Sequence, residues 1–444
     1  MRRIIVVIPG ILGSVLKRGG KQMWGYGRLA KEAAQLGHRL VTDLQLAPAA
    51  FSRGTEGYDD GIEAEALLPS LGLIPGFFGS TGYSDLIAAL ENEFPGAVYS
   101  FPYDWRQSNR ASAQRLKEWL TPILIDARRL DSRCQVSFVC HSMGGLVARY
   151  FAHCLDSLGV TQRIICIGTP FLGSVKALNS WFPRRVGRIG PDLSQLVRSF
   201  PSAAELLPVY PCVNLGIRKT LVPLTDAGFE EVYEAAHHGA DFHLEMRQAV
   251  SRRSSASGPV YHVILGNSQR TPVVFSMSEA DSLPPADSPY SQSGDGTVAR
   301  ISAFPPEWED DAACFFASGR HASLQSTKNI VRQVLGILSA RPRPPMATPL
   351  GIAVESDEDA IAVGDKLTVR GTFASRELST PMTLSLYDDA GELYSGPSPF
   401  RKVSATEWIA TTVLRRRGLF RWDAASALDA NEKLQPISDV VIVL

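Results

Sequence analysis

Ser142 is the residue of this sequence best placed to act as a nucleophile. It lies in the segment 136–150, where apolar and β-branched residues lead into a Cys-His-Ser-Met-Gly-Gly turn and then into a stretch of helical periodicity. A strand, a sharp turn and a helix in this order expose a serine hydroxyl at the end of a sheet, as in the Gly-x-Ser-x-Gly nucleophile elbow. The alternative is a glycine-rich strand-to-helix turn in which Ser142 only caps the helix.

Small residues around the serine let the strand and the helix approach each other closely. Gly144 and Gly145 supply them on the helix side, whereas Cys140 stands where the motif usually has glycine on the strand side. His141 directly precedes the serine, and on a sharp elbow we expect its side chain to point away from the hydroxyl.

A serine hydroxyl becomes a good nucleophile when a histidine, oriented by a carboxylate, takes its proton. In chains with a nucleophile elbow the three residues follow the order serine, acid, histidine. His153 and His262 fall inside a predicted helix and a predicted strand, so we expect them in the core, and the histidines at 237–243 precede the completion of the sheet. His321 falls in a loop between the last predicted strand and the last predicted helix. It is therefore the predicted base.

Asp295 is the predicted acid because flanking glycines hold it in a tight turn before a strand-like segment. The acidic residues at 307–311 are interpreted as a solvated charge run. If Asp295 and His321 have no catalytic role, both are surface-loop residues. The other acidic candidates before the base are Asp281, Asp287, Glu307, Glu309, Asp310 and Asp311.

Attack on an acyl group creates an oxyanion, which backbone N–H groups stabilise. The first predicted strand, residues 3–8, ends in a Pro-Gly-Ile-Leu-Gly-Ser turn at 9–14. In α/β-hydrolases a turn in this place supplies one N–H, and the residue after the nucleophile supplies the other. We therefore expect the amides of Ile11 and Met143 to form an oxyanion hole. The alternative for Ile11 is an ordinary Pro-Gly turn.

The elements that must position these residues follow an α/β pattern. Short apolar runs bounded by turns are typical of strands buried on both faces of a parallel sheet. The sequence predicts an α/β-hydrolase fold in residues 1–340, a mostly parallel sheet with helices on both faces. Cap insertions are expected at about 17–80, which looks irregular, and at 171–258, which looks mostly helical. A proline-rich linker, 341–350, leads to a period of two in 351–444, which predicts an all-β, sandwich-like domain.

Composition narrows the class of protein. Lys plus Arg and Asp plus Glu both number 45, and no basic block suggests a nucleic-acid partner. The six cysteines show no Cys-x-x-Cys pair and are expected to be reduced core residues, so neither a metal nor another cofactor is predicted. The basic, then apolar N-terminus is interpreted as a buried strand rather than a signal peptide. No uncharged apolar run reaches the roughly 18 residues of a spanning helix, and we expect a cytoplasmic protein.

Five motifs, in this order, resemble the lecithin:cholesterol acyltransferase-like lipases. The resemblance spans roughly residues 4–340 and implies that Ser142, Asp295 and His321 match the family's catalytic triad, and the amides of Ile11 and Met143 its oxyanion hole. The motifs are Pro-Gly-Ile-Leu-Gly at 9–13, Pro-Tyr-Asp-Trp-Arg at 102–106, His-Ser-Met-Gly-Gly at 141–145, Ser-Phe-Pro-Ser at 199–202 with Leu-Pro at 207–208, and Gly-Asp-Gly-Thr-Val at 294–298.

Two features lie outside the resemblance. No cysteine precedes Cys134, so the disulfide-closed lid of the secreted animal enzymes is not carried over, and 351–444 has no counterpart.

In the Pro-Tyr-Asp-Trp-Arg motif, Asp104 and Arg106 are expected to form an ion pair that fixes the loop.

The predicted function is a serine hydrolase or O-acyltransferase that acts on lipid acyl esters through an acyl-enzyme on Ser142. The predicted partners are a lipid or acyl-ester substrate, a membrane surface contacted peripherally and a protein bound through 351–444. The alternative function is a binding or effector module, in which a hydrolase-like body offers its apolar cleft and the β domain docks a protein partner.

Overall fold

The computed structural model describes residues 3–25, 43–70, 72–74, 78–182, 193–215, 221–252, 258–276, 291–308, 313–339, 352–373, 381–404, 407–426 and 436–444. Several features predicted from the sequence lie outside these residues. They are the helix-like stretch 29–36, the linker 341–350, and the acidic candidates Asp281, Asp287, Glu309, Asp310 and Asp311.

A six-stranded parallel sheet forms the centre of the molecule, in the order β15-β11-β9-β8-β1-β7. The inner strands β1, β8, β9 and β11 each carry a run of buried, mostly apolar residues because both faces of the sheet are covered. In β1, for example, Ile4 and Val6 join the hydrophobic cluster on one face, whereas Ile5 joins the cluster on the other. The strands are β1 (Arg3–Ile8), β7 (Val98–Ser100), β8 (Gln135–His141), β9 (Thr161–Ile167), β11 (Val260–Asn267) and β15 (Phe315–Ser318).

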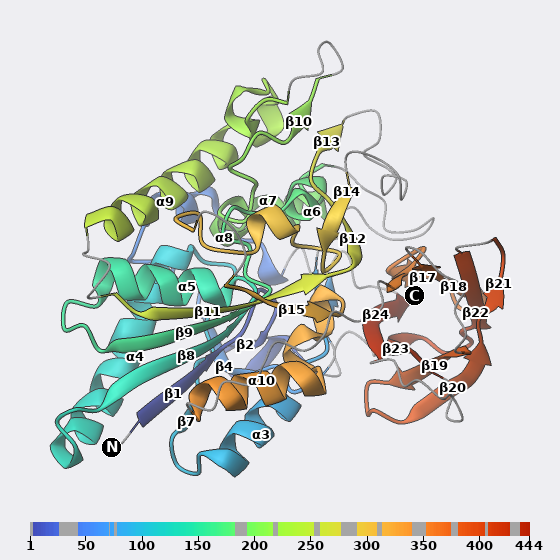
Figure 1. Cartoon of the computed structure of the whole chain (residues 1–444). Helices are drawn as coiled ribbons and strands as arrows, with labels where there is room; N and C mark the ends of the chain where they lie inside the picture. Colours follow the sequence, from blue (N-terminus) through green and yellow to red (C-terminus); the bar gives the residue numbers. More distant parts are fainter. Residues whose placement is uncertain are drawn as a thin grey trace.

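Helices cover both faces of this sheet (Figure 1). The helices α4 (Asn109–Leu130) and α5 (Gly144–Tyr150) pack on one face, and α3 (Ser84–Glu93) and α10 (Lys328–Leu338) pack on the other. The helices α3, α4 and α10 present an apolar stripe to the sheet, whereas all seven residues of α5 are buried. The predicted α/β-hydrolase fold is confirmed.

The first insertion is more regular than predicted. Strands β2 (Ser14–Arg18), β3 (Lys21–Trp24) and β4 (Ile62–Leu67) form an antiparallel sheet in the order β3-β2-β4, so the irregular interpretation of 17–80 was wrong. Gly19 and Gly20 join β2 to β3 with φ angles of 54° and 78°. Two left-handed residues are the signature of a tight hairpin, and a Gly-Gly pair favours them. The flanking strands are short and partly polar, which concealed this signal.

The second insertion is mostly helical in its described residues, as predicted. It contributes α6 (Val175–Asn179), α7 (Ser194–Arg198), α8 (Pro201–Ala204) and α9 (Tyr233–Arg252), coloured green to yellow-green in Figure 1. A two-residue strand, β10 (Val213–Asn214), pairs with β13 (Phe275–Ser276). Nearby, β12 (Gln269–Pro272) pairs with β14 (Ser291–Gly294), which leads into the turn that carries the predicted acid.

The C-terminal region contains two further sheets, and its described residues between 352 and 444 are all-β, as predicted. Their inner faces share one hydrophobic cluster that includes Val369, Trp422 and Val441. The boundaries of the predicted domains remain a prediction. One sheet consists of β16 (Ile352–Ser356), β18 (Lys366–Phe373), β22 (Glu407–Val413) and β21 (Arg401–Lys402), and the other of β17 (Ala360–Ile361), β24 (Ile437–Val443), β23 (Gly418–Ser426), β19 (Met382–Asp388) and β20 (Leu393–Pro399).

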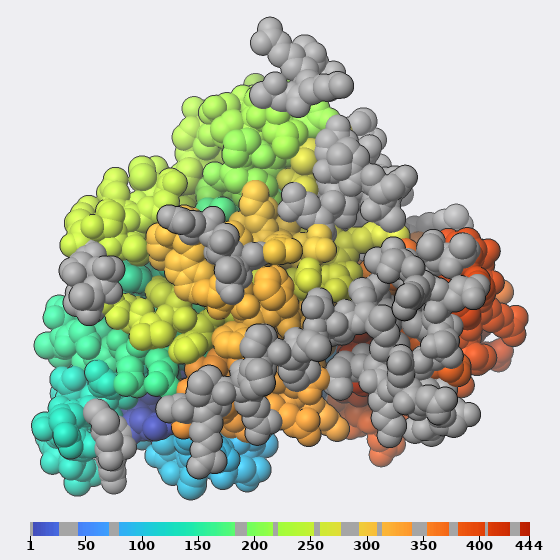
Figure 2. Space-filling model, in the orientation of Figure 1, coloured from blue at the N-terminus to red at the C-terminus, as the bar shows by residue number. Residues whose placement is uncertain are grey.

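This C-terminal unit forms one flank of the molecule, coloured red in Figure 2. The structure describes all six cysteines; none of them forms a disulfide bond, and five are buried, as expected for reduced core residues. Among the residues that the structure describes, no helix has the length and apolar character needed to cross a membrane.

Candidate active site

Ser142 lies at a sharp turn between β8 and α5 with a φ of 53°, a left-handed conformation that is rare outside glycine. The glycines that follow make this turn sterically feasible. A Cβ on Gly144 would lie 2.5 Å from the carbonyl oxygen of Pro9, and one on Gly145 would lie 2.1 Å from the hydroxyl oxygen of Thr169. Strand, strained serine and close-packed helix together form the geometry of a nucleophile elbow.

The structure brings the three side chains named from the sequence into one hydrogen-bonded row. His321 Nε2 lies 2.8 Å from Ser142 Oγ, and His321 Nδ1 lies 2.7 Å from Asp295 Oδ2. An ionised carboxylate only accepts hydrogen bonds, so Nδ1 carries the proton and Nε2 is free to accept the serine proton. All three residues are buried, with exposed fractions of 1–3%.

The backbone holds Asp295 and His321 together. Asp295 Oδ1 accepts hydrogen bonds from the amides of Thr297 (2.9 Å) and Val298 (2.6 Å), and the His321 amide donates to the Asp295 carbonyl oxygen (2.8 Å). The acid packs directly on the end of β11, where a Cβ on Gly266 would lie 2.3 Å from Asp295 Cβ. Asp295 Oδ2 is therefore directed at the imidazole, because Oδ1 is occupied by the turn.

The other candidates have different partners. Glu307 forms two hydrogen bonds, of 2.9 and 2.6 Å, with the buried guanidinium of Arg149, while its own side chain stays 34% exposed. Burial would raise the pKa of Glu307, but Arg149 outweighs this effect and lowers it. His153 Nε2 lies 2.8 Å from the Tyr261 hydroxyl, and His243 Nε2 donates to the carbonyl oxygen of Glu205.

At the predicted oxyanion hole, two buried amides have no hydrogen-bond acceptor among the described residues. Ile11 and Met143 are 5% and 0% exposed, and no hydrogen bond between described residues uses either N–H. Buried backbone amides are nearly always paired, so two unpaired ones beside a nucleophile suggest an external acceptor. The turn of Ile11 lies against the elbow, because a Cβ on Gly10 would lie 2.8 Å from Ser142 Cβ.

Three aromatic side chains hold the carbonyl groups of this turn. Tyr103 donates to the carbonyl oxygen of Pro9 (2.9 Å) and Trp24 to that of Leu12 (2.9 Å). Trp105 donates to the carbonyl oxygen of Ser14, the last residue of the turn (3.2 Å). Leu12 has a φ of 65°, and its strained conformation persists because the surrounding bonds determine it. With the carbonyl groups fixed by these donors, the orientation of the intervening amides is fixed as well.

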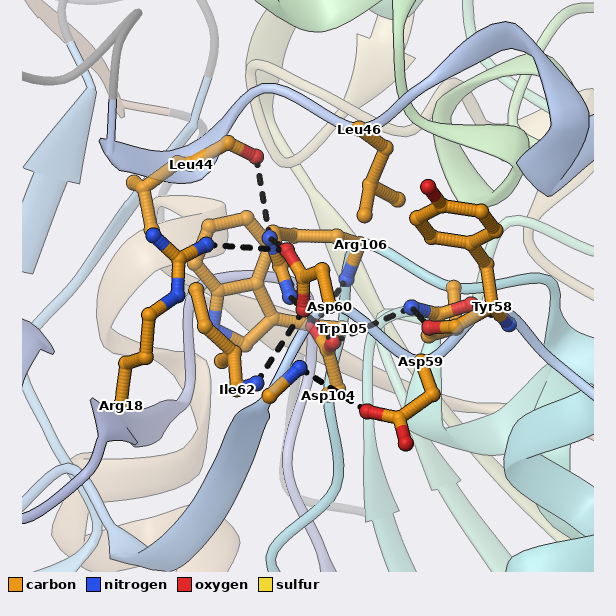
Figure 3. A network of polar contacts seen from close by, with 12 residues as sticks. Arg18, Leu44, Leu46, Tyr58, Asp59, Asp60, Ile62, Asp104, Trp105 and Arg106 are labelled. Atoms are coloured by element: carbon orange, nitrogen blue, oxygen red, sulfur yellow. Dashed lines mark hydrogen bonds and ion pairs between the residues drawn. The ribbon is translucent and has the colours of Figure 1, made fainter.

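The Pro-Tyr-Asp-Trp-Arg loop is held by Arg106, which is fully buried (Figure 3). All five N–H groups of its guanidinium are used: two donate to Asp104, two to Asp60 and one to the carbonyl oxygen of Leu44. Burial alone would lower the pKa of Arg106, but the two carboxylates raise it. The predicted Asp104–Arg106 ion pair is confirmed. Asp60 was missed, since it lies in the insertion and belongs to no motif.

Tyr83 is a second residue of this site, after Asp60, that no sequence motif indicated. Its hydroxyl lies 2.9 Å from the amide of Gly10 and 2.9 Å from Nδ1 of His141. Both ring nitrogens of His141 bond elsewhere than to Ser142, in line with the expected orientation of this side chain. Burial is the larger cause and repulsion from His321 the smaller one, and together they lower the pKa of His141 to about 3. Its imidazole is therefore neutral at physiological pH.

Comparison with solved structures finds weak likenesses. The crystal structure of a Tle4-Tli4 complex is 16% identical and covers 77% of this chain and 97% of its own, with a TM-score of 0.44. Phospholipase PlaB from Legionella pneumophila is 10% identical over 99% of this chain and 90% of its own, with a TM-score of 0.35. Lipase BlEst2 from Bacillus licheniformis, in its propeptide form, is 13% identical over 99% and 93%, with a TM-score of 0.35.

At these TM-scores the likenesses add nothing to the fold that the sheet topology establishes. No curated protein sequence matches the chain. The family model described as lecithin:cholesterol acyltransferase matches residues 80–221, a segment that includes the elbow serine and the Pro-Tyr-Asp-Trp-Arg loop. Over this segment the predicted resemblance to the lecithin:cholesterol acyltransferase family is confirmed, and with it a chemistry of lipid acyl esters at the level of the family.

Proposed function

We propose that this protein is a serine-dependent lipid acyl-ester hydrolase, of the lipase or phospholipase A type, or an O-acyltransferase. In either case the acyl group passes through an acyl-enzyme on Ser142. The observation that carries the proposal is the buried row in which His321 lies 2.8 Å from Ser142 and 2.7 Å from Asp295. A serine, a histidine and a carboxylate in this arrangement form the working parts of an acyl-transfer site.

The reaction follows from the roles that this geometry allows. Ser142 Oγ attacks the ester carbonyl carbon while His321 Nε2 takes its proton. The negative charge moves to the carbonyl oxygen, which the amides of Ile11 and Met143 stabilise. The imidazolium, stabilised by Asp295, then protonates the leaving alcohol, and the acyl-enzyme remains. Water or a second alcohol attacks the acyl-enzyme with the same histidine as base, which releases a fatty acid or a new ester.

The choice between water and alcohol depends on how well the cap excludes water from the acyl-enzyme. Incubation with a lipid ester and a long-chain alcohol separates the two outcomes. Both release the alcohol part of the lipid, but hydrolysis yields free fatty acid, whereas transfer yields the ester of the added alcohol. A cytoplasmic location, contact with a membrane surface and a protein partner for 351–444 stay predictions.

Substitution of the nucleophile tests the proposal. Ser142→Ala should lower the turnover of a p-nitrophenyl acyl ester by about 10⁶-fold, the loss seen when a triad acts as a unit. A fluorophosphonate probe should label the parent protein and not the variant. Ser157→Ala, in an exposed turn, is the matched control and should keep both the activity and the labelling.

Two results would overturn the assignment. The first is a Ser142→Ala protein that turns over the ester near the parent rate. The second is a folded parent protein that the fluorophosphonate probe fails to label, because the probe reacts only with an activated serine. In the second case the alternative function would be favoured, in which the protein is a binding module whose cleft holds a ligand without catalysis.

A further inference from the structure

Arg320 directly precedes the proposed base and reaches into the C-terminal unit. Its guanidinium donates from Nε to Asp439 Oδ2 over 2.6 Å and from Nη1 to the carbonyl oxygen of Val354 over 3.2 Å. Asp439 lies in β24 and Val354 in β16, so both acceptors belong to the C-terminal unit. The side chains of Arg320 and Asp439 are only 10% and 14% exposed. A charge-assisted bond of this length, shielded from water, is among the stronger polar contacts in proteins.

The same guanidinium also touches the turn of the proposed acid. Gly296, which follows Asp295, has a φ of 86°, and a Cβ on it would lie 3.1 Å from Arg320 Cζ. Arg320 therefore lies between the acid turn, the loop of the base and strand β24. A displacement of β24 would reach both proposed catalytic side chains through this one residue.

Further contacts join the two parts near the same place. Ser323, two residues after His321, donates to the carbonyl oxygen of Ser438 over 2.8 Å. In β24 itself, Val440 and Ile442 belong to the hydrophobic cluster of the hydrolase body, whereas Val441 belongs to the core of the C-terminal unit. In Figure 1, β24 is the strand of the red unit drawn next to the orange segment before α10. Strand β24 is thus shared by the two hydrophobic cores.

The buried cation needs this carboxylate. Burial would lower the pKa of Arg320, but Asp439 and then Glu355 outweigh that effect and raise it. Without Asp439, the guanidinium would remain buried with the Val354 carbonyl as its one remaining hydrogen-bond acceptor among the described residues. A buried charge deprived of its partner moves toward water or draws its surroundings with it. Either response would shift the loop that carries His321.

We propose that the C-terminal unit holds the base in place, with Asp439 and Arg320 acting as positioning residues for His321. The inference rests on the proposed function of Ser142, His321 and Asp295. It gives residues 352–444 a role inside the catalytic reaction, distinct from the docking of a partner. Proton transfer from Ser142 depends on tenths of an ångström, and a misplacement of about 1 Å can lower a rate about 10²-fold.

The test compares variants of the full-length chain. Asp439→Asn keeps the shape of the side chain and removes its charge, Asp439→Glu restores the charge, and Asp357→Asn is the matched control. Asp357 pairs with Arg370 within the C-terminal unit (2.7 Å), and both side chains are 40% exposed. For each variant kcat and KM for a p-nitrophenyl acyl ester, the rate of fluorophosphonate labelling, and the melting temperature are measured.

Asp439→Asn should lower kcat and the labelling rate by about 10-fold or more with little change in KM, because the fault lies in the alignment of the base. Asp439→Glu should recover part of the loss, and Asp357→Asn should match the parent. A change in kcat without a change in KM, together with its partial recovery in Asp439→Glu, is a readout that a general loss of stability would not produce.

The outcomes separate this inference from the proposed function. If the parent is labelled at Ser142 and folded Asp439→Asn equals it in kcat and in labelling rate, the positioning role is wrong while the proposed function stands. If the parent itself is not labelled, the proposed function fails first. Should Asp439→Asn not fold, Ser323→Ala replaces it. That change removes the hydrogen bonds from the Ser323 hydroxyl to the carbonyl oxygens of Ser438 and Arg320, and parental kcat there would overturn the inference.

Discussion

Nε2 of His141 lies 3.1 Å from the backbone carbonyl oxygen of His321. A carbonyl oxygen only accepts, so this nitrogen carries the proton, and Nδ1 of His141 accepts from the hydroxyl of Tyr83. The same hydroxyl accepts from the amide of Gly10, next to Ile11. The residue before the proposed nucleophile thus links the turn of the proposed oxyanion hole to the backbone of the proposed base.

Tyr83→Phe should weaken this link while keeping the ring. The change leaves Nδ1 of His141 without a donor and the amide of Gly10 without an acceptor, and an unpaired buried polar group costs about 1–3 kcal/mol. We expect the free energy of unfolding, measured in urea, to fall by about this amount and kcat to fall by about 10-fold. Tyr394→Phe, whose hydroxyl accepts from the exposed Arg415 amide, is the control. Equal kcat in both variants would argue against the link.

Asp295→Asn should distinguish the proposed acid from the other described candidate. The amide oxygen can still accept from Thr297 and Val298, but its NH₂ group would face Nδ1 of His321 and favour the wrong tautomer. The expected loss in kcat is about 10⁴-fold. Glu307→Gln removes the charge that pairs with the buried Arg149 and should lower kcat far less than Asp295→Asn does, because Glu307 forms no hydrogen bond with His321. If Glu307→Gln lowered ester turnover more than Asp295→Asn, Glu307 would be the acid.

The substitution Thr169→Gly should restore stability lost by an alanine at Gly145, but not stability lost by an alanine at Gly144. A Cβ on Gly145 would meet the side chain of Thr169, whereas a Cβ on Gly144 would meet the carbonyl oxygens of Ile8 and Pro9. Substitution by alanine should cost about 1–3 kcal/mol at each site. Thr169→Gly should recover stability in Gly145→Ala and none in Gly144→Ala, as measured by a double-mutant cycle in urea. Equal recovery would contradict the close packing at the elbow.

His243 should make the stability of the protein sensitive to acid. Burial lowers its pKa from 6.5 to about 4, so below pH 6.5 the unfolded chain binds a proton that the folded chain does not. The free energy of unfolding should therefore fall as pH decreases from 6.5 toward 4, by about 1.4 kcal/mol for this residue at about pH 5.5. The free energy of unfolding is measured in urea at about pH 7.5 and about pH 5.5. The loss between the two pH values should be smaller in His243→Gln than in the parent by this amount. An unchanged difference would show that His243 is protonated in the folded state.

The sequence by itself determined the class of the fold and the three residues proposed for catalysis. Ser142, Asp295 and His321 each follow a strand or lie in a turn near one, and these local patterns are visible along the chain. Because parallel strands bring their carboxyl ends to one edge of a sheet, such residues can be expected to meet there. The structure places them within hydrogen-bonding distance of one another.

Only the tertiary structure decided which residues hold that site in place. Asp60, Tyr83 and Asp439 contact their partners across 46, 58 and 119 residues of sequence, and none lies in a motif. The hairpin at 14–24 was missed for a related reason, since its short strands alternate weakly and are recognisable only once β4 pairs with β2. A hydrophobic period or a turn is a property of adjacent residues, whereas the partner of a buried charge is chosen by the packing of distant segments.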